Sequence, residues 1–183
     1  MISDDDDLQG AAAFESAATD VAISGDGTRI AIGAYKADGT DGVRGGGRVR
    51  VFKYDGGDSW SQVGADLLGG ALDGFGEKVG MSDDGKRIII AAPSFGFDNA
   101  GMVQVYLDDK GTWVNVGQNL TGDEDFAWYG SDVAMSKTKG ERVFVAGGKT
   151  TAEGVFAGVV RAYEFREPSD SPDEENRGWT QVG

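Results

Sequence analysis

Short apolar runs separated by glycine-rich polar turns recur along the whole chain. Residues 48–51 alternate between arginine and valine, which is the period of two expected for a strand with one buried face. The isoleucines at 88–90 and the Val-Phe-Val run at 143–145 are continuous, and such runs predict strands covered on both faces. Asp-Gly pairs at 26–27 and 84–85 lie between apolar runs, where a glycine with positive φ closes a hairpin. The pattern predicts an all-β protein.

The same order of elements occurs three times. Two apolar runs around a turn lie at 19–34, 78–92 and 132–147. A glycine-led alternating run follows each pair, at 47–52, 101–106 and 158–163. Each unit closes with a Trp-x-x-Val-Gly segment, at 60–64, 113–117 and 179–183, whose tryptophan is expected to pack between neighbouring units. Internal repeats of four short strands are typical of β-propeller blades.

We therefore expect one propeller domain of three four-stranded antiparallel blades. The expected bounds are 1–10 for an acidic lead-in and linker, then 11–64, 65–117 and 118–183 for the blades, with an acidic insertion at 166–178 in the third. Three blades are fewer than the four to eight that close a propeller. Two alternatives follow and stay open: the chain is part of a larger propeller, or two copies form a six-bladed dimeric ring.

Composition narrows the function classes. The chain has 183 residues and a formal net charge of −14, and such a surface repels nucleic acid and anionic membranes. The absence of Cys and His removes thiolate chemistry and the commonest general base. No apolar run is long enough for a membrane span, and the first ten residues do not have the pattern of a signal peptide. These features disfavour an enzyme and membrane insertion.

Residues around the apolar pairs resemble the FG-GAP repeat of integrin-type β-propellers. The resemblance rests on Phe75-Gly76 with the Ala-Ala-Pro step at 91–93, and more loosely on Tyr129-Gly130 with Ala146-Gly147. In the first unit the Phe-Gly step is replaced by Ala17-Ala18. The resemblance implies a propeller fold, an extracellular or cell-surface location, and calcium held in an Asp-rich loop between the first two strands of a blade.

The calcium loop is shortened in this chain. The corresponding turns at 24–29 and 82–87 offer few of the six to eight oxygens that calcium needs, so Asp26 and Asp84 are interpreted as turn formers. We expect no cofactor, with calcium at those two turns disfavoured. Weak metal candidates remain at Asp38, Asp41 and Asp123, although acidic clusters of this kind are more often solvated loops.

The loops after the second strand and between units carry aromatic and polar residues. The ligand-binding candidates are Phe95, Phe97, Asp98, Asn99, Asp125, Phe126 and Trp128. Aromatic rings beside polar groups suit sugars or peptide side chains. The alternative is that the rings close the ends of the blades and pack between sheets.

These expectations favour a non-catalytic binding or scaffold module that recognises protein or glycan through the loops. A self-assembling structural building block is the first alternative. A glycan-active hydrolase using the carboxylates of Asp98 and Asp125 is the second.

Overall fold

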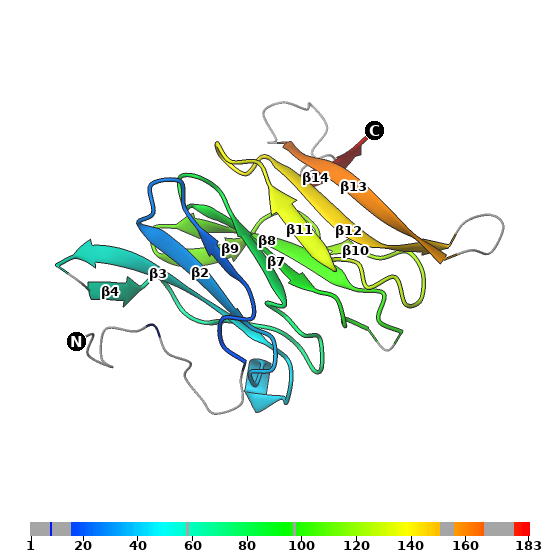
Figure 1. The fold of residues 1–183 in the computed structure, drawn as a ribbon, viewed down its shortest axis with the longest axis horizontal. Helices are drawn as coiled ribbons and strands as arrows, with labels where there is room; N and C mark the ends of the chain where they lie inside the picture. Colours follow the sequence, from blue (N-terminus) through cyan, green and yellow to red (C-terminus); the bar gives the residue numbers. More distant parts are fainter. Residues whose placement is uncertain (1–7, 9–15, 58, 97, 151–155, 167–177) are drawn as a thin grey trace.

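The structure is a computed structural model, and it describes residue 8 and residues 16–57, 59–96, 98–150, 156–166 and 178–183. This part of the chain is all-β and contains no α-helix, only a short 3-10 turn, η2 (Thr40–Gly42). Its strands form three antiparallel sheets that lie side by side in chain order (Figure 1). The predicted all-β class is therefore confirmed.

Each sheet is built mainly from strands that are consecutive in the sequence. The N-terminal sheet contains β1 (Val21–Ile23), β2 (Arg29–Ala34), β3 (Arg48–Gly56), β4 (Ser59–Gln62) and β5 (Leu67–Leu68). The middle sheet contains β6 (Lys78–Met81), β7 (Arg87–Ala92), β8 (Met102–Asp109), β9 (Thr112–Asn115) and β10 (Leu120–Thr121). The C-terminal sheet contains β11 (Asp132–Met135), β12 (Arg142–Thr150), β13 (Phe156–Arg166) and β14 (Gly178–Val182).

The three sheets share one strand order and one register. In each, the first strand pairs with the second, the second with the third and the third with the fourth. The central pairing places Gly33 opposite Val49, Ala91 opposite Val103, and Ala146 opposite Val160. Because side chains alternate between faces, this common register assigns equivalent residues to equivalent faces in all three sheets.

The hydrophobic core lies between the sheets, in two layers. One layer joins the N-terminal and middle sheets and includes Val49, Ile88 and Ile90, while the other joins the middle and C-terminal sheets and includes Ile89 and Val143. The middle sheet is therefore covered on both faces, as its three consecutive isoleucines predicted. The C-terminal sheet differs, because Phe144 is 45% exposed between two fully buried valines.

Loops that precede the first strands wedge aromatic residues between the sheets. Phe75 and Tyr129 are fully buried, and the hydroxyl groups of Tyr129 and Tyr163 lie 2.7 Å apart. Gly76, at φ +87°, follows Phe75, and a Cβ there would lie 2.8 Å from a methyl group of Val49 in the preceding sheet. The Phe-Gly step thus allows one sheet to approach the backbone of the next.

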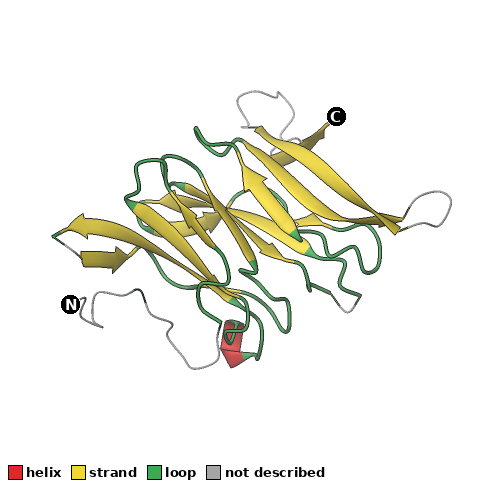
Figure 2. Cartoon of the chain, viewed as in Figure 1, coloured by secondary structure: helices red, strands yellow, loops and turns green. Residues whose placement is uncertain are grey.

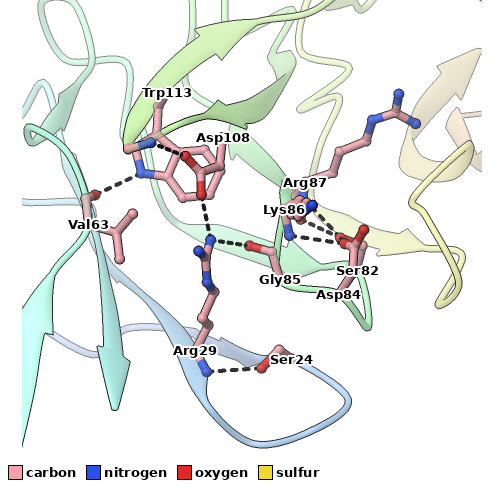
Figure 3. Close-up of polar contacts among 11 residues, drawn as sticks. Ser24, Arg29, Val63, Ser82, Asp84, Gly85, Lys86, Arg87, Asp108 and Trp113 are labelled. Carbon is pink, nitrogen blue, oxygen red and sulfur yellow. Dashed lines mark hydrogen bonds and ion pairs between the residues drawn. The ribbon is translucent and has the colours of Figure 1, made fainter. Parts of the chain in front are cut away.

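Polar contacts connect neighbouring sheets in the same way twice. The indole Nε1 of Trp113 donates to the carbonyl oxygen of Val63, and that of Trp179 donates to the carbonyl oxygen of Val116, both at 2.9 Å. Arg29 donates to the Gly85 carbonyl oxygen and forms an ion pair with Asp108 (Figure 3). These contacts fix the position of each sheet on its neighbour.

The tight turns confirm the assignment of Asp26 and Asp84 as turn formers. Oδ1 of Asp26 accepts hydrogen bonds from the hydroxyl of Ser24 and from the amide and hydroxyl of Thr28. These bonds lower the pKa of Asp26 to about 2. Asp84 accepts equivalent bonds from Ser82 and from the Lys86 amide (Figure 3). Each Asp Oδ1 is therefore engaged by donors of its own turn.

Parts of two expected segments lie outside the described residues. Of the acidic lead-in at 1–10 only Leu8 is described, and of the insertion at 166–178 only its first and last residues. Those two residues, Arg166 and Gly178, pair directly between β13 and β14.

Candidate binding site at the loop end

Among the described residues, the longer connections gather at one end of the sheets, along the lower side of the molecule in Figure 2. Backbone hydrogen bonds join the loop after β7 to the loop after β10. The amide of Phe126 donates to the carbonyl oxygen of Asp98 at 2.7 Å, and the amide of Trp128 donates to that of Asn99 at 3.0 Å. The structure therefore brings together two loops that were chosen separately from the sequence.

Two aromatic side chains of this loop end are open to solvent. Phe126 is 52% and Trp128 is 43% exposed, and their ring centroids lie 6.0 Å apart at an interplanar angle of 52°. Both residues have positive φ, +57° and +42°, which is unfavourable for bulky side chains. The interleaved Ala127 and the following Tyr129 are buried. The loop therefore directs Phe126 and Trp128 outward, although their positive φ values are unfavourable for the backbone.

Two carboxyl groups lie near each other on these loops. The neighbouring Asp98 side chain raises the pKa of Asp125, as a hydrogen-bonding partner first and through its negative charge second. The Asp98 Oδ1 also lies 3.3 Å from the Ala100 amide, which donates to it. Neighbouring carboxylate oxygens accept hydrogen bonds, which suits a ligand rich in hydroxyl or amine groups.

A cavity of about 510 Å³ lies between the connection at 69–74 and the β7–β8 loop. It is lined by Ala71, Leu72, Asp73, Ser94, Phe95, Gly96 and Asn99. Leu72 is 72% exposed at φ +59°, and burial raises the pKa of Asp73, which accepts a hydrogen bond from the Gly70 amide. Its volume is in the range of small-ligand pockets, roughly 300–1,000 Å³.

Phe95 and Asn99 are the predicted residues that line this cavity. Phe95 is half-buried and packs against the core between the N-terminal and middle sheets. Phe97 lies outside the described residues. Leu72, Asp73 and Ser94 were not predicted, and the available signal was an apolar leucine inside the glycine-rich connection at 69–74. The remaining candidates, Asp98, Asp125, Phe126 and Trp128, form the neighbouring surface.

The three metal candidates, Asp38, Asp41 and Asp123, lie in different surroundings from the ligand-binding candidates. Asp123 accepts from Lys149 at 2.9 Å and from Arg161 at 2.8 Å, which lowers its pKa to about 2. Two cations at one carboxylate oxygen disfavour a third. Asp38 and Asp41 are exposed in the β2–β3 connection, Asp41 within η2. Across the described residues, no group of three or more acidic side chains is arranged to hold a metal ion.

Comparison with known proteins identifies no family for this sequence. The sequence matches no protein-family model, and no curated protein matches it significantly. In the described part of the chain, no helix has the length and apolar character needed to cross a membrane. The functional argument therefore rests on the geometry of the loop end and of the sheets.

Proposed function

We propose that the three sheets are consecutive blades of a β-propeller and that the chain is a non-catalytic binding module. The propeller is supported by the shared strand order and register, and by the repeated Trp-to-Val hydrogen bond from each sheet to the preceding one. In a propeller the connections at one end of the blades lie side by side, so neighbouring loops form a composite surface.

The loop end is the proposed binding surface, and the exposed pair Phe126 and Trp128 is the observation that carries this proposal. A bulky residue at positive φ costs on the order of 1–2 kcal/mol. In this loop that cost is borne by two residues whose rings stay in solvent, which favours a use for them outside the core. Aromatic rings beside paired carboxyl groups provide a stacking face and hydrogen-bond acceptors together. The proposed ligand is a glycan or an extended segment of another protein.

The composition of the chain favours binding over catalysis. The chain contains no histidine and no cysteine, so both the commonest general base and the thiol nucleophile are missing.

The test is a binding screen of the purified chain against immobilised oligosaccharides and extended peptides, read by biolayer interferometry. We expect a subset of one class to be retained. Phe126→Ala and Trp128→Ala should each weaken that binding by about tenfold or more, because truncated aromatic contacts at interface centres cost on this scale.

Val114→Ala is the matched control, because Val114 is 45% exposed on β9, away from the loop end. It should bind like the unmodified chain. Retention that is equally strong in Phe126→Ala and Trp128→Ala would place the binding surface elsewhere and overturn the proposal. Turnover of a bound glycan, abolished in Asp125→Asn, would replace binding with catalysis.

A further inference from the structure

The outer face of the N-terminal sheet has the composition of an interface. We call the face that carries Val21, Ile23, Tyr54 and Trp60 the N-face. Val21 is 53% exposed, Ile23 60% and Tyr54 37%. The register makes Val21 equivalent to Val79, since they pair with Ile32 and Ile90 at the same place in their sheets. Val79 is 6% exposed because the N-terminal sheet covers it, so the N-face repeats a surface that is buried elsewhere in the chain.

The outer face of the C-terminal sheet has the complementary composition. This C-face carries Phe144, 45% exposed, and Val160, 67% exposed, around a hollow of about 160 Å³. Their equivalents in the middle sheet, Ile89 and Val103, are fully buried beneath the C-terminal sheet. One molecule therefore exposes both halves of an interface that it also forms twice internally.

We propose that the N-face of one copy of this chain docks on the C-face of a second copy, in the geometry that joins consecutive sheets. The occupant follows from complementarity: each face matches the other in equivalent residues and register, and a second copy supplies both. Such head-to-tail contacts close into a ring or extend into a longer assembly. The N-face and C-face share no residue with the loop end, so this inference stands independently of the proposed binding function.

Trp60 is already oriented for this contact. Its ring lies 5.3 Å from that of Tyr54 at 53°, and the equivalent pair in the C-terminal sheet, Trp179 and Phe165, lies 5.1 Å apart at 57°. Trp179 uses that orientation to donate to the Val116 carbonyl oxygen. The docked Trp60 would donate its Nε1 to the carbonyl oxygen of Val182 in the second copy.

A place for the Trp60 indole exists on the C-terminal sheet. Gly64 and Gly117 follow the two acceptor valines, and a Cβ at either position would lie within 3.0 Å of the next sheet's tryptophan ring. Gly183 follows Val182 with φ +99°, and no heavy atom of the described residues lies within 4 Å of its Cβ position. The surface beside Gly183 thus offers the room that the Trp113 and Trp179 rings occupy at the equivalent glycines.

Arg142 supplies a contact in the opposite direction. Its equivalent Arg87 donates to the Lys139 carbonyl oxygen in the next sheet and lies over the Phe165 ring at 5.1 Å. Arg142 is 63% exposed and paired with Glu164 within its own sheet. In the docked pair the guanidinium of Arg142 in the second copy would face the Gly27 carbonyl oxygen and the Tyr54 ring of the first copy. Gly27 is the counterpart of Gly85, whose carbonyl oxygen Arg29 contacts, and Tyr54 is the counterpart of Phe165.

The experiment is light scattering on the purified chain, coupled to size-exclusion chromatography over a wide range of concentrations. We expect twice the mass of one chain, or a larger assembly, at high concentration. Trp60→Ala on the N-face and Val160→Glu on the C-face should each give the mass of one chain. Arg142→Ala, at an exposed position, should raise the concentration needed for association, and Val114→Glu, outside both faces, should associate normally.

Mixing the two face variants tests the head-to-tail arrangement. A mixture of Trp60→Ala and Val160→Glu retains one unmodified N-face and one unmodified C-face, so it should regain the mass of a pair. Circular dichroism spectra that match the unmodified chain would exclude misfolding as the cause of dissociation. A single-chain mass at every concentration overturns the proposal, as does association that survives both variants or that mixing does not restore.

Discussion

The indole nitrogen of Trp113, in β9 of the middle sheet, lies 2.9 Å from the carbonyl oxygen of Val63 in the N-terminal sheet and donates a hydrogen bond to it. Trp113 is 9% exposed, so the bond lies between the two sheets. Trp179 and Val116 repeat the contact one sheet further along. Trp60 has the same position in its own sheet, but its indole lies on the open N-face.

Replacing Trp113 by phenylalanine should destabilise the fold. Phe keeps an aromatic ring but removes the N–H, so the Val63 carbonyl oxygen loses its partner in the sheet interface. An unpaired buried acceptor costs about 1–3 kcal/mol. Urea denaturation followed by circular dichroism would measure the change. Trp60→Phe, studied at a dilution where the chain is monomeric, should change stability by much less, and equal losses in the two variants would contradict this account.

Substitutions at two glycines separate backbone strain from packing between sheets. Gly27 and Gly117 have similar φ values, +73° and +77°, but only Gly117 is close to the next sheet, with Cδ1 of Trp179 at 2.7 Å from a Cβ position. Gly27→Ala should cost about 1–2 kcal/mol for positive φ alone. Gly117→Ala should cost about 1–3 kcal/mol more, from overpacking. Thermal melts of both variants would show the difference, and melting at equal temperatures would argue against close sheet contact at Gly117.

The ion pair between Arg29 and Asp108 should contribute more than a surface pair. Burial alone would raise the pKa of Asp108, but the hydrogen bond and charge of Arg29, with the Gly111 amide, lower it. Asp108→Asn should cost about 1–3 kcal/mol, since the side chains are only 8% and 19% exposed. Glu164→Gln, in the exposed pair with Arg142, should cost less than about 1 kcal/mol. The reverse order in urea denaturation would contradict this ranking.

Acid should weaken the contacts around Asp123. Its pKa is lowered from 3.8 to about 2 by Lys149 and Arg161, so the folded state binds this proton less readily than the unfolded state. The stabilisation is therefore complete above about pH 4 and is lost as the pH falls through 2. Because Asp123 is half-exposed, the effect should stay below about 1 kcal/mol. Between about pH 4 and pH 2 the urea midpoint should fall less in Asp123→Asn than in the unmodified chain, although Asp26 still titrates in that range in both. An equal fall in the two proteins would contradict the assignment.

Most strands and the packing of tryptophans between sheets could be predicted from the sequence. The alternation of apolar and polar residues and the presence of turn-forming residues are local signals. The isoleucines of β7 predicted a strand covered on both faces, and the tryptophans that recur once per unit predicted packing between sheets, which Trp113 and Trp179 show. The same logic did not predict that Phe144 would be exposed, because its exposure depends on what covers the C-terminal sheet rather than on the strand itself.

The loop end was only partly predictable, since it depends on contacts between distant residues. Nothing local distinguishes the exposed rings of Phe126 and Trp128 from the half-buried ring of Phe95. The ion pairs of Asp123 also come from residues far along the chain, on β12 and β13. Leu72 lines the cavity with a positive φ. The neighbouring glycines indicate a turn, but they do not predict a positive φ at Leu72 itself.

Hydrogen–deuterium exchange would test the proposed binding surface most directly. The amides of the unmodified chain would be compared with and without a saturating amount of the tightest-binding oligosaccharide or peptide of the screen. We predict slower exchange confined to the loops at 93–101 and 122–131 and to the connection at 69–74. Protection that appears instead on the turns at 24–29 and 82–87, at the opposite end of the sheets, would contradict the proposal that the loop end binds the ligand.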